Sequence, residues 1–243
     1  MDPRLNIIDK RLGKIKRIIA VSGGKGGIGK SLVASTCALS LGKQGYRVGL
    51  LDLDFCSPST HVILGIEGAY PEEEKGIVPP VVYGINFMSI AYFTGDSPSA
   101  LRGSTVSNAI IELLAITQWG RLDFLVMDMP PGMGDPALDV IRLVKRIEYL
   151  LLTIPSRVAL EVMKKEFQML RELGMAVVGI LENMKQNQYS FTEKEVVNLK
   201  VPFLGSLDFD LNLEEAIGNP HELLKTGFAR QLEKALKASL LIP

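Results

Sequence analysis

Short aliphatic and β-branched runs alternate along the chain with longer segments of helical period. The runs have the length and residue types of β-strands, and they cover residues 17–21, 48–52, 86–90, 124–127, 149–153, 176–181 and 203–207. Several of them are apolar throughout, which is typical of strands that are covered on both faces. The alternation therefore predicts an α/β fold with a mostly parallel sheet and helices on both faces.

The segments of helical period lie between these runs, and they predict helices over residues 30–44, 105–117, 137–146, 159–173 and 220–240. Residues 65–84 break the alternation, because they hold three consecutive glutamates, have prolines and glycines near their ends and show little periodicity. We expect an exposed insertion between two strands there. No internal repeat and no long linker divides the chain, so we expect a single domain over residues 1–243.

Composition and charge exclude several classes of function. The 243 residues are 47% hydrophobic, which is enough to bury a full core. Lys+Arg and Asp+Glu each number 27, so the chain has no global basic field to attract nucleic acid or anionic lipid. The chain has no apolar run of the roughly 18 residues that a membrane span needs, and its first residues lack an apolar signal core. We expect a cytoplasmic protein with no nucleic-acid partner and no stable membrane association.

The two cysteines limit metal chemistry. They cannot form a disulfide framework or a Cys-x-x-Cys metal site on their own. Cys37 lies within the apolar pattern of the first predicted helix and should belong to the core. Cys56 follows the second predicted strand; it could pair across a dimer to hold a thiophilic metal such as nickel, or it could pack as a small side chain.

A glycine-rich loop follows the first predicted strand and opens the first predicted helix. It has the spacing Gly24-x4-Gly29-Lys30-Ser31 of a phosphate-binding loop, in the strand-to-helix context that such a loop requires. Its glycines let backbone N–H groups point at phosphate oxygens, while Lys30 should reach the β and γ phosphates and Ser31 should ligate Mg²⁺. The expected nucleotide-binding residues of this loop are Gly24, Lys25, Gly26, Gly27, Ile28, Gly29, Lys30, Ser31 and Leu32.

The second lysine of the loop, Lys25, carries a resemblance to a known family. The order GGKGGIGKS resembles the deviant loop of the Mrp/MinD and ParA-like ATPases, which are P-loop NTPases of the SIMIBI class. The likeness continues through LLDLDFCSPSTHVILG, WGRLDFLVMDMPPGMGD and GILENM, and it covers most of residues 10–185. In that family the extra lysine crosses a dimer interface to the partner's phosphates, so the resemblance implies a homodimer with ATP sandwiched at the interface. An exposed lysine in a glycine loop is the alternative.

Three aspartates close predicted strands. Asp52 and Asp54 share one side of the second strand by their period-2 spacing, and Asp128 ends the run FLVMD. Ligands of open α/β sheets bind at this carboxyl edge. The resemblance implies that Asp52 holds an Mg²⁺-bound water, Asp128 is the Walker B aspartate, and Asp54 orients the attacking water as a catalytic residue beside Lys25 and Lys30. Taken alone, each aspartate could instead cap a helix or start a turn.

The segments after the later strands bear on the base and the γ phosphate. The chain lacks the Asn-Lys-x-Asp string of guanine-specific GTPases, whereas Asn183 stands where the family places its adenine-contacting Asn, which favours ATP and ADP. The segment FLGSLDFDLNLEEA resembles the family's second base-side loop, although Asp208 stands where a proline is usual. Residues 130–135 would form the switch loop that senses the γ phosphate.

The family serves several functions, and the segment after Asn183 decides among them. It reads MKQNQYSFTEKEVV, without the Cys-x-x-Cys with which cluster-carrier relatives bridge an iron–sulfur cluster across a dimer. This form looks most like the archaeal HypB-type ATPases of [NiFe]-hydrogenase maturation, which work with a separate HypA-type nickel metallochaperone. Our first hypothesis is therefore a slow ATPase switch that assists nickel delivery.

Alternative functions remain open at this point. One is a positional ATPase like MinD or ParA on a membrane or nucleoid, and another is an Mrp-type iron–sulfur carrier without its own Cys-x-x-Cys. The apolar stripe of Phe228, Leu232 and Leu236 on the last predicted helix suits a membrane contact, but a helix that docks on its own domain has the same stripe. A metabolic ligase or kinase on the same scaffold would need a substrate motif that we do not find.

Overall fold

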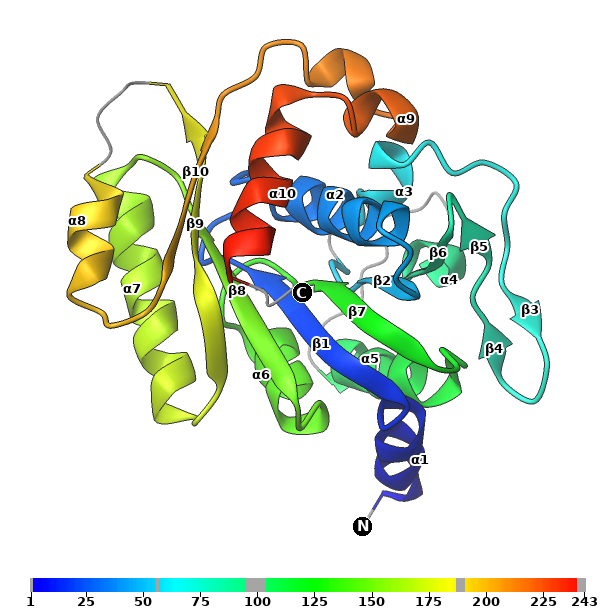
Figure 1. Ribbon diagram of the computed structural model, residues 1–243. Coiled ribbons are helices and arrows are strands. Elements are labelled where there is room, and N and C mark those ends of the chain that lie inside the picture. The colour runs from blue at the N-terminus through cyan, green and yellow to red at the C-terminus, as the bar shows by residue number, and fades with distance from the viewer. Residues whose placement is uncertain (1, 56, 95–103, 187–190, 240–243) are drawn as a thin grey trace.

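A computed structural model describes residues 2–55, 57–94, 104–186 and 191–239 of the chain (Figure 1). Its centre is an eight-stranded sheet in the order β10-β9-β8-β1-β7-β2-β6-β5. The strands are β1 Ile15–Ser22, β2 Val48–Asp52, β5 Val81–Val82, β6 Ile85–Ser89, β7 Leu122–Asp128, β8 Ile147–Thr153, β9 Ala176–Lys185 and β10 Phe203–Asp208. Neighbouring strands run parallel except for the short β5, which is antiparallel to β6. The predicted strands and the mostly parallel sheet are confirmed.

Helices cover both faces of the sheet, as the sequence predicts (Figure 1). One face is covered by α1 Pro3–Leu12, α5 Ser104–Ile116, α6 Asp135–Leu143, α7 Arg157–Glu172 and α8 Thr192–Val197. The other face is covered by α2 Lys30–Lys43, α3 Thr60–Ile63, α9 Pro220–Leu223 and α10 Gly227–Ser239. The central strand β1 faces both cores, because Ile18 belongs to the first and Ile19 to the second.

The C-terminal segment differs from its prediction. A single helix over residues 220–240 is wrong, because the segment divides into α9 and α10. The hydroxyl of Thr226 accepts a hydrogen bond from the backbone N–H of Ala229 at 3.1 Å, which caps a new helix. Phe228, Leu232 and Leu236 are buried in the core beneath α10, so the apolar stripe docks on the chain's own fold. Residue 240 lies outside the described residues.

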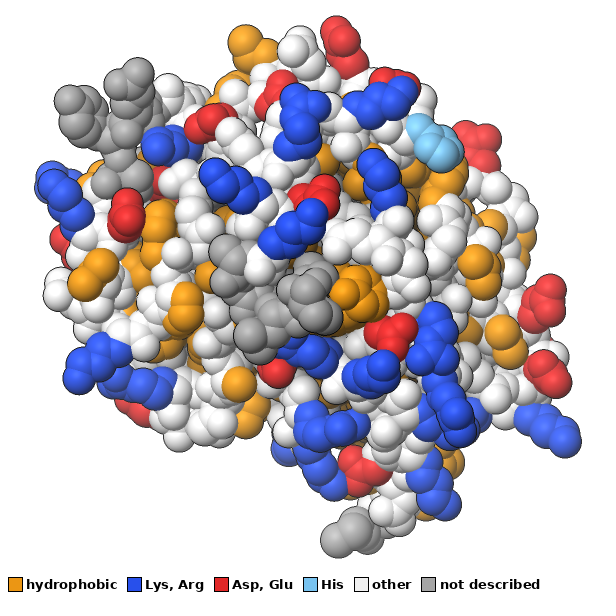
Figure 2. Space-filling view, in the orientation of Figure 1, with side chains coloured by type: hydrophobic (Ala, Val, Ile, Leu, Met, Phe, Trp, Pro, Cys, Tyr) orange, Lys and Arg blue, Asp and Glu red, His pale blue; other side chains and the backbone are white. Residues whose placement is uncertain are grey.

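The insertion over residues 65–84 is ordered into short elements. β3 Glu72–Glu73 pairs with β4 Ile77–Val78 in a small antiparallel sheet, and β5 joins the edge of the main sheet. Figure 2 shows acidic side chains along the outer margin of the molecule where this insertion lies, and both residues of β3 are exposed. The prediction of an exposed insertion is therefore confirmed, although the strands within it were not predicted.

The sequence also gave no prediction of several helices. α1 begins at Pro3 behind an Asp2 cap, whose carboxylate accepts the N–H of Arg4 at 2.9 Å, and it buries Ile8 and Leu12. The others have at most six residues, and they are α3, α4 Ala91–Thr94, α8 and the 3₁₀ turn Glu214–Ala216. None of the helices in the described ranges is long and apolar enough to cross a membrane.

Candidate nucleotide-binding site

The glycine-rich loop joins β1 to α2 at the carboxyl edge of the sheet. Gly27 and Gly29 have φ angles of 76° and 87°, in the left-handed region that favours glycine. Gly29 has a second constraint, because a Cβ there would lie 2.4 Å from Nδ2 of Asn183. Lys25, Gly26 and Gly27 are exposed. The strand, loop and helix thus have the arrangement that a phosphate-binding loop requires.

The two lysines of the loop lie in different environments. Lys30 is only 7% exposed, and its Nζ donates a 3.4 Å hydrogen bond to the backbone carbonyl of Lys25. Lys25, in contrast, is exposed at the outer rim of the loop. A buried Lys30 can meet phosphates within its own chain, whereas an exposed Lys25 is accessible to another chain.

Asp52 and Asp128 end neighbouring strands at the same edge. Their Cα atoms are partners in the β2–β7 register, and both side chains are fully buried. One carboxylate oxygen of Asp52 accepts the hydroxyl of Thr60 at 2.6 Å and the N–H of Thr60 at 3.2 Å, and the other accepts the N–H of Asp54 at 3.0 Å. Neither carboxylate oxygen of Asp128 has a hydrogen-bond partner within 3.5 Å among the described residues, although the Ser31 hydroxyl lies near enough to lower its pKa.

Burial raises the pKa values of both aspartates. For Asp52, hydrogen bonds from Thr60 and Asp54 act in the opposite direction but do not outweigh burial. The pKa of Asp128 lies well above its usual range because of burial and the negative charge of Asp52. The hydroxyl of Ser31 and the positive charge of Lys30 lower this pKa but do not outweigh the two larger effects. A divalent cation would relieve this electrostatic cost, and Mg²⁺ prefers carboxylate and hydroxyl oxygens. The residues present therefore fit an Mg²⁺ site formed by Ser31, Asp52 and Asp128.

Asp54 begins a turn after β2. Its carboxylate accepts the backbone N–H of Ser57 at 3.0 Å, while its own N–H binds Asp52. The side chain is half-buried at the edge that holds the glycine-rich loop. Asp54 thus has a structural role in this state, and its orienting of an attacking water stays a prediction. Cys56, the weak metal candidate, lies outside the described residues.

The expected switch segment, residues 130–135, connects β7 to α6 at the same edge. The backbone N–H of Met129 binds the carbonyl of Val21 at 3.1 Å, which joins the start of this segment to the end of β1. Gly132 has a φ of 75°, and Pro131, Gly134 and Asp135 are exposed. The segment is thus anchored beside the glycine-rich loop and accessible beyond it.

Asn183 lies where β9 passes the glycine-rich loop. It is 3% exposed, and its Nδ2 donates a 2.9 Å hydrogen bond to the carbonyl of Ile28. In this structure the amide therefore supports the loop, and its contact with adenine stays a prediction. Residue Glu182, directly before it, is also buried and accepts hydrogen bonds from Thr192 and from Ser206.

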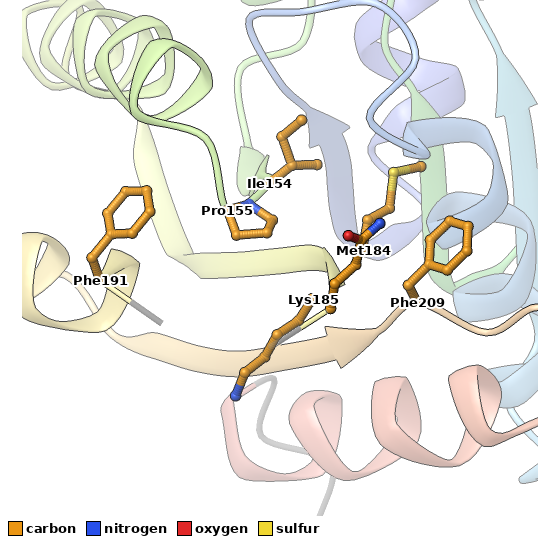
Figure 3. Close-up of a pocket in the computed structure, with 7 residues that line it drawn as sticks. Ile154, Pro155, Met184, Lys185, Phe191 and Phe209 are labelled. Carbon is orange, nitrogen blue, oxygen red and sulfur yellow. The ribbon is translucent and has the colours of Figure 1, made fainter. Parts of the chain in front are cut away.

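A cavity of about 430 Å³ opens at the ends of β8, β9 and β10 (Figure 3). Figure 3 shows Met184 beside Phe209 on one side of it and Phe191 on the other, with Pro155 between. The remaining lining residues are Ile154, Lys185 and Gln186. A cavity with apolar walls and a few polar groups is typical of a small-molecule site. Sequence reasoning placed a base-side loop here but missed these apolar walls; the position of Met184 directly after Asn183 was the available signal.

Two further residues bear on metal chemistry. Thr60, which sequence reasoning missed, holds Asp52 through both its hydroxyl and its N–H. Cys37 is fully buried as predicted, and burial raises the pKa of its thiol to about 12, so it stays protonated at neutral pH. Among the residues that the structure describes, no group of three or more His, Cys, Asp or Glu side chains could hold a metal ion.

Comparison with known proteins supports a family assignment. The model of a ParA family described as NUBPL iron-transfer P-loop NTPases matches residues 14–239. An iron–sulfur cluster carrier protein of Aquifex aeolicus is 37% identical over 222 residues, with 85% of this chain and 61% of the relative covered. A protein of the same name from Methanocaldococcus jannaschii is 34% identical, with 95% and 86% covered. The chain thus spans about three fifths of the length of the Aquifex relative.

Solved structures agree with this result. A nucleotide-binding protein of Archaeoglobus fulgidus in complex with ADP, in which cobalt was found, has a TM-score of 0.74 at 30% identity, with 94% of this chain and 92% of that one covered. The septum site-determining protein MinD of Pyrococcus horikoshii, complexed with Mg-ADP, has a TM-score of 0.69 at 21% identity, with 91% and 95% covered. At 21% identity, the similarity to MinD shows a shared fold only.

These comparisons correct one expectation. They support the Mrp/MinD resemblance, but they do not support the closeness to HypB-type ATPases or the HypA-type partner. The relatives reported above at 34% identity or more are named iron–sulfur cluster carriers. They therefore favour the iron–sulfur alternative over nickel delivery. The missing Cys-x-x-Cys did not predict the family correctly, because the family match depends on residues 14–239 and not on one segment.

Proposed function

The chain belongs to the ParA-type family of NUBPL iron-transfer P-loop NTPases, and from this premise we propose that it is an Mg²⁺-dependent ATPase whose nucleotide cycle serves iron–sulfur cluster assembly. The observation that carries the ATPase part is the buried Lys30 beside Asp128, whose two carboxylate oxygens lack partners among the described residues. The iron–sulfur part is supported by the names of its relatives.

ATP binding would use the whole carboxyl edge of the sheet. The backbone N–H groups of residues 24–31 and the ammonium of Lys30 would hold the phosphates. The cavity walled by Met184 and Phe209 suits the adenine base, beside the predicted contact with Asn183. Ser31, Asp52 and Asp128 would hold Mg²⁺, which when bound supplies charge neutralisation at the phosphate oxygens.

Hydrolysis would depend on positioning more than on covalent chemistry. Asp54 would orient the attacking water, after the turn that it forms with Ser57 opens enough for its carboxylate to face the γ phosphate. Lys25 would come from a second copy of the chain and stabilise charge on the transferred phosphoryl group. Because both events need rearrangement or assembly, we expect slow turnover that suits a switch.

The cysteines determine how the chain can take part in cluster assembly. Cys37 is buried and protonated, so a homodimer could offer at most its two Cys56 thiolates. A cluster with four thiolate ligands needs cysteines from elsewhere. We therefore propose that the ATPase acts on a cluster that a second protein with its own cysteines holds, and that ATP controls the association with that protein.

A cluster-transfer assay tests this function. A Cys-x-x-Cys carrier loaded with a [4Fe–4S] cluster would be mixed anaerobically with this chain and an apo-ferredoxin acceptor, with ATP or ADP present. We expect faster transfer with ATP than with ADP, and no acceleration by Lys30→Ala. Equal transfer with and without the wild-type chain would remove the iron–sulfur role while leaving the ATPase proposal intact.

Nickel delivery remains the second candidate because of one sequence feature, the missing Cys-x-x-Cys after Asn183. The same experiment separates the two functions if a HypA-type nickel metallochaperone replaces the cluster carrier. Nucleotide-dependent binding to that protein, without any effect on cluster transfer, would favour nickel delivery. The positional role on a membrane has less support, because the apolar face of α10 is buried in the fold.

A further inference from the structure

A buried acid lies beneath the glycine-rich loop. Glu166, on α7, is 3% exposed, and one of its carboxylate oxygens accepts the hydroxyl of Ser22. Ser22 is the last residue of β1 and directly precedes the glycines of the loop. The other carboxylate oxygen of Glu166 has no hydrogen-bond partner among the described residues. No role assigned above uses this side chain.

α7 supports the loop at two points, one turn apart. Glu166 holds Ser22, and Val162, four residues earlier on the helix, packs so closely against Gly24 that a Cβ there would lie 2.3 Å from the Val162 Cγ1. The first half of the glycine-rich loop is thereby fixed to α7. A change at Glu166 can thus act on phosphate binding without contact between its own carboxylate and the nucleotide.

The groups that face Glu166 come from three elements. Ser22 of β1 donates a hydrogen bond, Lys30 of α2 supplies positive charge, and Tyr149 of β8 presents a buried hydroxyl that lacks a partner among the described residues. Burial raises the pKa of Glu166, while the Ser22 hydroxyl and Lys30 act in the opposite direction. The pKa of Tyr149 is raised by burial and by the charge of Glu166.

We propose that Glu166 is a positioning residue that holds the start of the glycine-rich loop through Ser22 and takes up one proton when the phosphates of a nucleotide bind. The inference rests on the proposed nucleotide function and deepens it. Bound phosphates interact with Lys30 and add negative charge at the loop. The charged form of the buried Glu166 carboxylate therefore becomes unfavourable. The proton comes from solvent and binds the carboxylate oxygen without a partner, while the other oxygen keeps its bond to Ser22.

The consequence is a linkage between pH and nucleotide affinity. If Glu166 gains a proton on binding, its contribution to affinity increases as the pH falls. Glu166→Gln keeps the shape and an acceptor for Ser22 but carries no charge. This variant should bind ADP more tightly than wild type at high pH, and the ratio of the two dissociation constants should approach one at low pH. A tenfold ratio corresponds to a displacement of the Glu166 pKa by about one unit on binding.

The experiment measures ADP dissociation constants from pH 5.5 to 8.5 by calorimetry, in EDTA, for wild type, Glu166→Gln and the control Glu172→Gln, an exposed glutamate of the same helix. Repeating each titration in two buffers of different ionisation enthalpy counts the protons taken up. We expect Glu166→Gln to take up fewer protons than wild type and to bind up to about tenfold more tightly at pH 8.5, and we expect Glu172→Gln to match wild type.

A second variant keeps the inference testable if Glu166→Gln does not fold. Ser22→Ala removes the hydroxyl that lowers the pKa of Glu166, so the pH at which ADP affinity changes should move upward. A pH-independent ratio between Glu166→Gln and wild type, or an unmoved profile for Ser22→Ala, overturns the role of Glu166 alone. Failure of the wild-type chain to bind ADP at any pH overturns the proposed function as well.

Discussion

Asp52 and Asp128 are Cα partners on adjacent parallel strands, and both are completely buried. Their hydrogen bonding is unequal, because Asp52 is held by Thr60 and Asp54 while Asp128 has no partner among the described residues. Two carboxylates in such proximity cannot both ionise cheaply without a cation. The pair therefore predicts how stability depends on pH and on magnesium.

The first prediction concerns Asp128→Asn. The folded-state pKa of Asp128 is raised, so this aspartate contributes stability below its unfolded pKa and loses that contribution as the pH rises through its folded pKa. In EDTA and without nucleotide, Asp128→Asn should therefore be more stable than wild type at pH 8 and lose this advantage toward pH 4. Chemical denaturation across this range measures it.

Asp123→Asn is the matched control for that series. Asp123 does not lie at the end of a strand, and its carboxylate forms ion pairs with Lys16 at 2.8 Å and with Arg47 at 3.2 Å. Hydrogen bonds from Arg47 and Lys16 hold the pKa of Asp123 below its usual range. Its removal should lower stability at pH 8, opposite in sign to Asp128→Asn. If Asp128→Asn is also less stable than wild type at pH 8 in EDTA, the burial of a charged Asp128 beside Asp52 does not govern its contribution to stability.

Sequence patterns predicted the features that depend on local order. Asp52 and Asp128 were found because each closes an apolar run, and parallel strands bring such ends together. The glycine-rich loop was found because Gly24, Gly29, Lys30 and Ser31 have the fixed spacing of a phosphate-binding loop. The sequence alone could not pair Ser22 with Glu166, which are 144 positions apart, because no periodicity connects a strand end to the third turn of a distant helix.

Local signals were also misjudged. α1 has a clear start signal at Asp2 and Pro3. It was not predicted, because its many charged residues leave only a weak apolar periodicity through Ile8 and Leu12. The predicted C-terminal helix was drawn through Thr226 because the residues on either side have helical period. Caps interrupt a periodic pattern without changing its hydrophobicity, so periodicity alone cannot locate them.

The second prediction tests that cap. Thr226→Ala removes the acceptor of the Ala229 N–H, and we expect a loss of about 1 kcal/mol of unfolding free energy. Thr226→Ser keeps the hydroxyl and should lose less. Urea denaturation of the three proteins measures the difference. Equal loss in both variants would show that packing of the Thr226 methyl group, and not the cap, stabilises the start of α10.

The third prediction separates binding from hydrolysis. Lys30→Ala should weaken ADP binding by about a hundredfold or more, because a buried ammonium that meets phosphates is lost. Asp54→Ala should bind ADP nearly as wild type does but hydrolyse ATP roughly a hundredfold more slowly. Lys43→Ala, an exposed lysine at the end of α2, is the control. Equal turnover by wild type and Asp54→Ala would remove Asp54 from its proposed role.

The fourth prediction concerns cluster content. With Cys37 buried and protonated, the chain should show no stoichiometric iron–sulfur absorption after anaerobic purification and reconstitution. Absorption spectra and iron determination measure this, and Cys56→Ala should leave both unchanged. A stable cluster at one per dimer that disappears in Cys56→Ala would instead make the chain a scaffold, with the remaining ligands supplied by another molecule.

The last prediction is that nucleotide state controls association through Lys25. An exposed lysine at the rim of the glycine-rich loop assists phosphate chemistry only if the phosphates of a second copy come within its reach. ATP should therefore favour a dimer, because the negative charge of its γ phosphate would be neutralised by Lys30 of the same chain and, only in the dimer, by Lys25 of the second copy. We expect wild type to sediment as a dimer with a non-hydrolysable ATP analogue and as a monomer with ADP.

Lys25→Ala should remain monomeric with both nucleotides, bind ADP as wild type does and lose hydrolysis. Lys30→Ala differs by losing nucleotide binding itself, and this contrast separates action within one chain from action between chains. We expect dimerisation also to bring the switch segments of both chains, residues 130–135, to one interface, where they would form a surface for a partner. A Lys25→Ala variant that dimerises and hydrolyses ATP like wild type would leave the exposed lysine without a role, and the protein would then act as a monomeric ATPase.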